Sequence, residues 1–325
     1  MRILVVVAVL SWRFATATRP IPIHYFFVNR TDYRDGRCPA SLEALVRRYR
    51  READRAKVAV TIDVYDYARA RDVVASVDEK LLFFWDRINL TYATILSNIF
   101  RYAMLFSRGG VYHDAKMGLS GEGLAELARY LAKYDMVFEE NPSPHLFKSK
   151  NRKLRNTNMA AATRGLNYFA TCLSEMRRKL EALHAAPPAP ERSRKVVFDL
   201  DSHTAIERLA RSRGAASKHH MLLAYRCRGQ RPTPPNCTDD ADVSGFVDGE
   251  SYVGRKWRGL EHVPEIAAAY NARSHWSEAQ EPIFESAPRP PPRGGDRPAR
   301  AKATGVGRLF DILHRIEDLA TPSRA

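Results

Sequence analysis

The chain lacks the patterns that mark several common classes of binding protein. Its four cysteines include no CxxC pair, which leaves a zinc site with little support. No recognition helix, zinc-finger spacing or RNA-binding signature accompanies the formal charge of +15, and the basic residues are spread along the chain. Nucleic acid is therefore not expected as a partner, whereas phosphate-bearing small molecules and anionic membrane surfaces both suit a positive chain.

The few cysteines also limit the possible disulfides. Cys38, Cys172, Cys227 and Cys237 allow three pairings in an oxidising compartment. Cys227 and Cys237 lie ten residues apart across a proline-rich loop, which favours a bridge between them. In a reducing compartment four free thiols are expected instead.

The first apolar run of the chain is too short to span a bilayer. Residues 1–18 combine a basic residue, the apolar run Ile3 to Leu10 and the small-residue site Ala15-Thr16-Ala17, a pattern typical of a secretory signal peptide. A first buried strand is the alternative, and without cleavage the run would act as a weak membrane anchor. Sequons at Asn29, Asn89 and Asn236 agree with a secretory location, in the Golgi lumen or outside the cell.

Apolar and aromatic runs alternate with helical patterns through the first half of the chain. This alternation predicts an α/β fold in which a mostly parallel, mixed sheet is flanked by helices in a single main domain, residues 19–285. A basic, proline-rich stretch, residues 286–304, reads as a disordered linker, and residues 305–325 as an amphipathic helix that docks on the domain, a partner or a membrane. The expected strands are 21–28, 57–65, 81–85, 111–112 and 134–139, and the main expected helices are 41–51, 91–108, 124–133 and 164–185, with a glycine-containing loop at 118–123.

The segment from Ser97 to Met117 carries the clearest sign of a binding site. Its helix is expected to end at the pair Gly109-Gly110 and to turn into a short strand that delivers Asp114. Ligands of open α/β sheets bind at the carboxyl ends of strands, so Asp114 stands where a metal or phosphate would bind. Asn98 and Arg101, three positions apart, share one flank of the helix and are expected to lean toward Asp114.

More ordinary interpretations of the same residues stay open. Asp114 would serve equally as a surface aspartate in a turn, and Arg101 as a solvated helix residue. His113 points to the opposite face of its strand from Asp114, so packing is expected there rather than ligation.

The segment SNIFRYAMLFSRGGVYHDAKM resembles the SDxxRYxxLxxxGGxYxDxD segment of glycosyltransferases of the GT-A fold with a sugar-binding DXD motif. That family includes yeast mannosyltransferases and the glucosylating clostridial toxins. The resemblance covers roughly residues 20–280. It implies a GT-A-like fold and a hexosyltransferase that moves a sugar from a nucleotide-sugar to a hydroxyl of a glycan or glycoprotein. The matching positions are Ser97, Arg101, Tyr102, Leu105, Gly109, Gly110, Tyr112 and Asp114.

The resemblance also assigns roles to single residues. It implies that Asp114, with His275, holds a manganese or magnesium ion that bridges the donor phosphates, and that Arg101 contacts the donor sugar or phosphates. It implies further donor contacts from the first strand, through Tyr25, Phe26 or Phe27 stacking on the base, and from four other residues. These are Asn98, Tyr102, Gly110 and Trp276.

Two positions depart from the family pattern. Lys116 stands in place of the second aspartate of DXD, and Asn98 in place of the aspartate after Ser97. A protonated lysine cannot ligate a hard cation, but it can neutralise a phosphate, which gives Lys116 a possible part in catalysis. Two functions are therefore expected from the sequence: a transferase with a weakly bound cation, or a non-catalytic protein that binds nucleotide-sugars or glycans. A basic scaffold is a third alternative.

Overall fold

The computed structural model describes residues 20–28, 32–115, 118–119, 121–141, 153–187, 221–226, 244–246, 251–252 and 282–290. Among the helices within these ranges, none is long and apolar enough to cross a membrane. Neither of the two cysteines that fall within them, Cys38 and Cys172, forms a disulfide in the structure. Several predictions lie outside the described residues: the signal peptide at 1–18, Asn29, Lys116, Cys227 with Cys237, Asn236, His275, Trp276 and the helix at 305–325.

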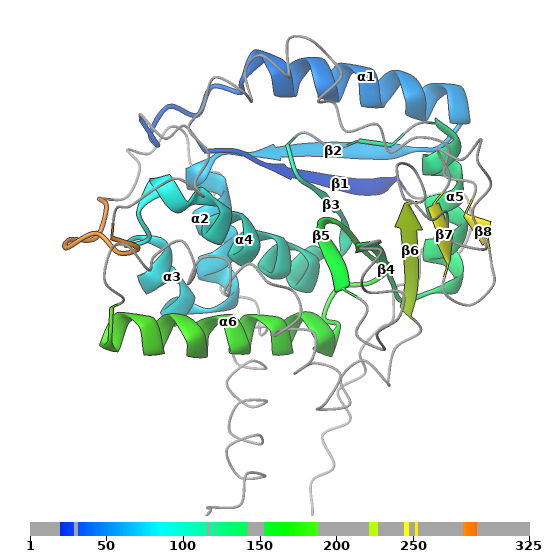
Figure 1. The fold of residues 1–325 in the computed structure, drawn as a ribbon. Helices are drawn as coiled ribbons and strands as arrows, with labels where there is room; N and C mark the ends of the chain where they lie inside the picture. Colours follow the sequence, from blue (N-terminus) through cyan, green and yellow to red (C-terminus); the bar gives the residue numbers. More distant parts are fainter. Residues whose placement is uncertain are drawn as a thin grey trace, which may run out of the picture.

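The centre of the fold is a mixed sheet with the strand order β2-β1-β3-β5-β4-β6-β7-β8 (Figure 1). Strands β2, β1 and β3 are parallel, β5 inserts antiparallel between β3 and β4, and β6 runs parallel to β4. The α/β class and the mixed sheet with flanking helices are thus confirmed. The strand bounds are β1 Ile21–Phe26, β2 Val60–Tyr65, β3 Gly110–His113, β4 Met136–Asn141, β5 Lys153–Ala161, β6 Met221–Arg226, β7 Ser244–Phe246 and β8 Ser251–Tyr252.

Helices cover both faces of the sheet and enclose two apolar cores (Figure 1). Alternate residues of β1 face opposite sides: Ile23 and Tyr25 pack with α1 and α5, whereas Phe26 packs with α2, α3, α4 and α6. Helix α4 buries the apolar face that its periodicity predicts, and Asn98 and Arg101 beside that face are buried as well. The helix bounds are α1 Ala40–Ala56, α2 Tyr67–Val77, α3 Glu79–Trp85, α4 Ala93–Arg108, α5 Gly121–Lys133 and α6 Asn167–Ala185, with a 3₁₀ turn at Leu90–Tyr92.

The prediction of a strand at residues 81–85 is wrong, because this run forms most of α3. Asp78 starts the helix: its carboxylate accepts hydrogen bonds from the backbone N–H groups of Lys80 and Leu81. The same carboxylate pairs with the Arg177 guanidinium of α6 at 3.1 Å. A short apolar run is compatible with a strand or a helix. Here the cap by Asp78 and its ion pair with Arg177 favour the helix.

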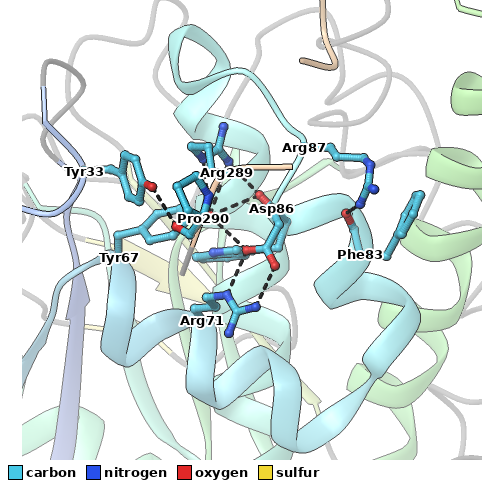
Figure 2. Close-up of polar contacts among 9 residues, drawn as sticks. Tyr33, Tyr67, Arg71, Phe83, Asp86, Arg87, Arg289 and Pro290 are labelled. Atoms are coloured by element: carbon cyan, nitrogen blue, oxygen red, sulfur yellow. Dashed lines mark hydrogen bonds and ion pairs between the residues drawn. The ribbon is translucent and has the colours of Figure 1, made fainter. Parts of the chain in front are cut away.

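Residues Pro282–Pro290, the C-terminal strap, dock on the turn after α3 (Figure 1, orange segment beside α3). The backbone N–H of Asn89 donates to the Ile283 carbonyl at 2.8 Å, and the N–H of Arg289 donates to the Asp86 carbonyl at 2.7 Å. The Arg289 side chain is buried under the strap (Figure 2). The prediction that a disordered linker begins at residue 286 is therefore wrong, and the folded part reaches at least Pro290.

A buried histidine of β1 makes the stability of this fold sensitive to acid. The His24 ring is held at 3.1 Å from the Gly109 carbonyl through Nε2, and its Nδ1 has no hydrogen-bond partner. Burial lowers the pKa of His24 to about 3, against a partly offsetting rise from the bond to Gly109. The folded protein therefore keeps His24 neutral at pH values where the unfolded chain protonates it.

We expect the free energy of unfolding to fall as the pH falls below about 6.5, the pKa of a histidine in the unfolded chain. Between about pH 7 and about pH 5 the loss from His24 amounts to about 2 kcal/mol. Urea denaturation at the two pH values measures it, with His24→Gln as the control, because glutamine keeps an amide donor but does not titrate. Equal pH dependence in both proteins would contradict the assignment.

Candidate functional site

The turn between α4 and β3 determines the geometry of the site. Gly109 ends the helix with φ 69°, and Gly110 comes next with φ 87°, conformations that favour glycine. A Cβ on Gly110 would lie 2.6 Å from the Pro22 carbonyl oxygen and 2.9 Å from the His24 ring, so no larger residue fits. This tight reversal lays β3 against α4 and brings the two halves of the motif face to face.

Four side chains from the two halves form one hydrogen-bonded group, which we call the Asp114 cluster: Ser97, Arg101, Tyr112 and Asp114. Arg101 Nη2 donates to Asp114 Oδ1 at 3.3 Å and to Ser97 Oγ at 3.1 Å. The Tyr112 hydroxyl donates to Asp114 Oδ1 at 2.9 Å and lies 2.6 Å from Ser97 Oγ. Because the single proton of Tyr112 goes to Asp114, the Ser97 hydroxyl donates to Tyr112. The Arg101 guanidinium also lies over the Tyr112 ring, 4.8 Å from its centroid.

Exposure differs sharply within the Asp114 cluster. The Arg101 side chain is 2% exposed, whereas that of Asp114 is 24% exposed. Burial, and then the charge of Asp114, raise the pKa of Tyr112 well above its usual value, so its hydroxyl stays a proton donor at neutral pH. The cluster thus presents one oriented carboxylate to solvent at the carboxyl end of β3.

The structure brings Arg101 and Asp114 together, as the sequence predicts, and it also shows a role for Tyr112. Alternation along β3 places Tyr112 and Asp114 on the same face, so a spacing of two residues could have indicated this contact. His113 points the other way, where Nε2 lies 3.0 Å from the Tyr49 hydroxyl in a fully buried contact. The prediction that His113 serves packing is confirmed.

The other residues assigned to donor binding are less exposed than that role suggests. Asn98 and Tyr102 are both buried on α4, next to Ser97 and Arg101 in the chain. Gly110 serves the turn itself. Because the side chains of Asn98 and Tyr102 are buried, a ligand at the surface has little access to either of them.

The prediction that Phe26 offers a face for base stacking is wrong. Its side chain belongs to the core, with ring centroids 5.7 Å from Trp85 and 5.2 Å from Phe100. Tyr25 is fully buried on the opposite face of β1, and only Phe27 of the three aromatic residues is half-buried. The sequence does not show which of these three aromatic residues is accessible. Long-range packing determines this, because it places an apolar core on each face of β1.

The described residues do not fit a divalent cation at this site. Within that part of the chain, no group of three or more histidine, cysteine, aspartate or glutamate residues comes together to hold a metal. Asp114 contributes one carboxylate, and its Oδ1 already accepts hydrogen bonds from Arg101 and Tyr112. Of the other residues implied in metal or phosphate binding, Lys116 and His275 lie outside the described ranges.

We expect Tyr112→Phe to weaken the function of the Asp114 cluster without unfolding the protein. Phenylalanine keeps the ring under Arg101 and removes only the hydroxyl that donates to Asp114 and accepts from Ser97. The loss of one such hydrogen bond corresponds to roughly a tenfold weaker ligand affinity and about 1 kcal/mol of stability. Titration calorimetry with nucleotide-sugars, the ligands that the resemblance in the sequence implies, measures the affinity. Tyr134→Phe, a half-buried tyrosine after α5, is the matched control and is expected to bind as the unaltered protein does.

No family model and no curated protein matches the chain. The motif in the sequence and the geometry of the Asp114 cluster therefore provide the basis for assigning a function.

Proposed function

We propose that the protein is a glycosyltransferase of GT-A-like fold that moves a hexose from a nucleotide-sugar to a hydroxyl of a glycan or protein acceptor. In this reaction the bond between the anomeric carbon and the terminal phosphate oxygen breaks, and the acceptor oxygen forms the new bond to that carbon. The acceptor hydroxyl gives its proton to the phosphate oxygen of the departing nucleoside diphosphate. Asp114 contacts the donor, and Arg101 positions Asp114.

The observation that carries the proposal is the pairing of Arg101 with Asp114 at the carboxyl end of β3. Both residues belong to the segment that resembles the glycosyltransferase motif, and the Gly109-Gly110 turn places them 3.3 Å apart. Strands β1 and β2 run parallel to β3, so their carboxyl ends lie at the same edge of the sheet. That edge is where ligands of α/β folds bind.

Incubation of the purified chain with a panel of nucleotide-sugars, in buffers with and without manganese, tests this function. We expect release of the nucleoside diphosphate from one donor, through slow transfer of the sugar to water, and loss of that release in Asp114→Ala. If the chain turns over no donor under either condition, the proposal that it is an enzyme is wrong.

A second candidate is a non-catalytic protein that binds nucleotide-sugar or glycan at the same place. The departures Lys116 and Asn98 favour it, because each replaces a carboxylate of the family motif. Measurable binding of a nucleotide-sugar that requires Asp114, without release of nucleoside diphosphate, would establish this candidate instead.

The proposed location is the secretory pathway, in the Golgi lumen or outside the cell, with a glycoprotein or glycan as acceptor. The signal-like residues 1–18 and the sequons support it, and membrane association would come from that segment or from residues 305–325. A folded protein that carries glycans at Asn89 after secretion by cultured cells would agree with this location.

A further inference from the structure

We propose that Arg69, Arg108 and Tyr65 form a second binding site, which takes a tetrahedral oxyanion such as the phosphate or sulfate group of a small molecule. The site lies beside β2, at one end of the sheet order, on the face that α2 and α4 cover (Figure 1). Arg108 ends α4 just before the amino end of β3, whereas Asp114 follows the carboxyl end of that strand. The inference therefore does not rest on the proposed function.

Tyr65 holds both arginines in place. The Arg69 guanidinium carbon lies over the Tyr65 ring, 4.8 Å from its centroid, and Arg69 Nη1 donates to the Val64 carbonyl at 2.6 Å. The Arg108 guanidinium carbon lies 5.8 Å from the same centroid, and Arg108 Nη1 donates to the Tyr65 hydroxyl at 3.0 Å. A guanidinium has five N–H donors, so most of those on the two exposed arginines are left for a ligand.

The two positive charges are not neutralised by ion pairs. Asp63 shares the face of β2 with Tyr65, and the Asp66 carboxylate caps α2 by accepting from the backbone N–H of Arg69 at 2.8 Å. Within the described ranges, neither carboxylate makes an ion pair with Arg69 or Arg108. The two guanidinium groups repel each other across one ring, and Arg69 lies in the first turn of α2, where the helix dipole disfavours a cation and favours an anion. A bound oxyanion relieves both unfavourable interactions.

The hydroxyl of Tyr65 points to the same ligand for a separate reason. Tyr65 is 1% exposed, and burial raises its pKa against partial offsets from the charges of Arg108 and Arg69, so the hydroxyl keeps its proton at neutral pH. The hydroxyl accepts from Arg108, but no residue in the described part of the chain accepts the hydroxyl proton. A buried donor without an acceptor is unfavourable, and an oxygen of the bound anion would supply that acceptor.

The arrangement of these donors favours a tetrahedral anion. Arginine binds phosphate oxygens through two parallel N–H groups, and such charge-assisted hydrogen bonds are about twice as strong as neutral ones. The donors come from three side chains on three elements, β2, α2 and α4. Phosphate and sulfate offer oxygens in several directions at once, which matches donors that approach from different elements.

Titration calorimetry of the full chain with inorganic phosphate, sulfate and a hexose phosphate, at low ionic strength, tests the inference. We expect saturable binding that Arg69→Gln and Arg108→Gln each weaken about tenfold or more. Arg50→Gln is the matched control, because it removes the same charge from an exposed position of α1, on the other face of the sheet, and it should bind as the unaltered protein does. Tighter binding of the hexose phosphate would identify an ester as the ligand, and equal binding would identify the free anion.

Two results would overturn the site: no binding of any of the three anions, or equal affinities in Arg69→Gln, Arg108→Gln and Arg50→Gln. Far-UV circular dichroism checks that each variant folds. If one arginine variant does not fold, the other still decides, together with Tyr65→Phe. That variant keeps the ring under Arg69 and is expected to weaken binding several-fold by removing the hydroxyl.

Discussion

Arg289→Ala is expected to lower the free energy of unfolding by about 3 kcal/mol or more, because it removes several buried hydrogen bonds at once. The Arg289 guanidinium lies against Tyr67 of α2 (Figure 2). It donates to the carbonyls of Trp85 and Ile88 at 2.7 and 2.5 Å. It also contacts the Tyr67 hydroxyl and the Glu285 carboxylate. Alanine would leave the two carbonyls without these donors.

Chemical denaturation followed by tryptophan fluorescence measures the loss. Arg289→Lys is expected to recover only part of it, since one ammonium group cannot reach both carbonyls with the fixed fork of a guanidinium. Arg37→Ala serves as the matched control: the Arg37 side chain is 90% exposed and pairs with Asp35 at the surface, so its loss should change stability by less than about 0.5 kcal/mol. Equal effects at the two positions would contradict the role of Arg289.

Two shortened chains distinguish the contribution of the strap from that of residues 291–325. A chain that ends after Pro290 keeps every strap contact, including the Tyr33 hydroxyl bond to the Pro290 carbonyl at 2.7 Å. A chain that ends after residue 281 loses them all. The first is expected to be half unfolded at nearly the same denaturant concentration as the full chain. The second is expected to be half unfolded at a much lower denaturant concentration.

Asp114→Asn is expected to reduce turnover of the nucleotide-sugar by about a thousandfold, the scale of losing a charged group that orients and stabilises a reacting ligand. Asparagine has almost the same size but carries no charge, so Arg101 loses its ionic partner in a buried position. The amide NH₂ group of asparagine is a hydrogen-bond donor, and Tyr112 and Arg101 are donors too, so it cannot replace the carboxylate as their acceptor.

Steady-state rates at a temperature below the unfolding transition measure this effect, with far-UV circular dichroism as a check on folding. Asp54→Asn, at an exposed position of α1, makes the same chemical change away from the site and should keep full activity. A rate for Asp114→Asn within about threefold of the unaltered protein would exclude Asp114 from the reaction.

The sequence predicts well where local rules decide. The periodicity of α4, the glycine pair and the alternation of β3 are enough to bring Arg101 toward Asp114. The prediction fails where distant contacts decide. Asp78 and Arg177 make a helix of the apolar run at 81–85, and burial of Arg289 orders a segment whose composition resembles a linker.

The arrangement of strands shows the same limit. Alternation of strand and helix predicts parallel pairing, and β1, β2 and β3 obey it. The insertion of β5 between β3 and β4 joins residues that are far apart in the chain, and no local pattern indicates it. The stacking role predicted for Phe26 fails for a related reason, since only the packed structure reveals that both faces of β1 are covered by helices.

Hydrogen exchange of the full chain with and without a saturating nucleotide-sugar tests the central claim most directly, because it locates the donor without relying on activity. If the Asp114 cluster is the donor site, protection will appear in the peptides that contain the carboxyl end of β3 and residues 97–101 of α4, and it will be absent from Asp114→Ala. Binding that protects other peptides and leaves this segment unchanged, or that persists in Asp114→Ala, would contradict the assignment of the site.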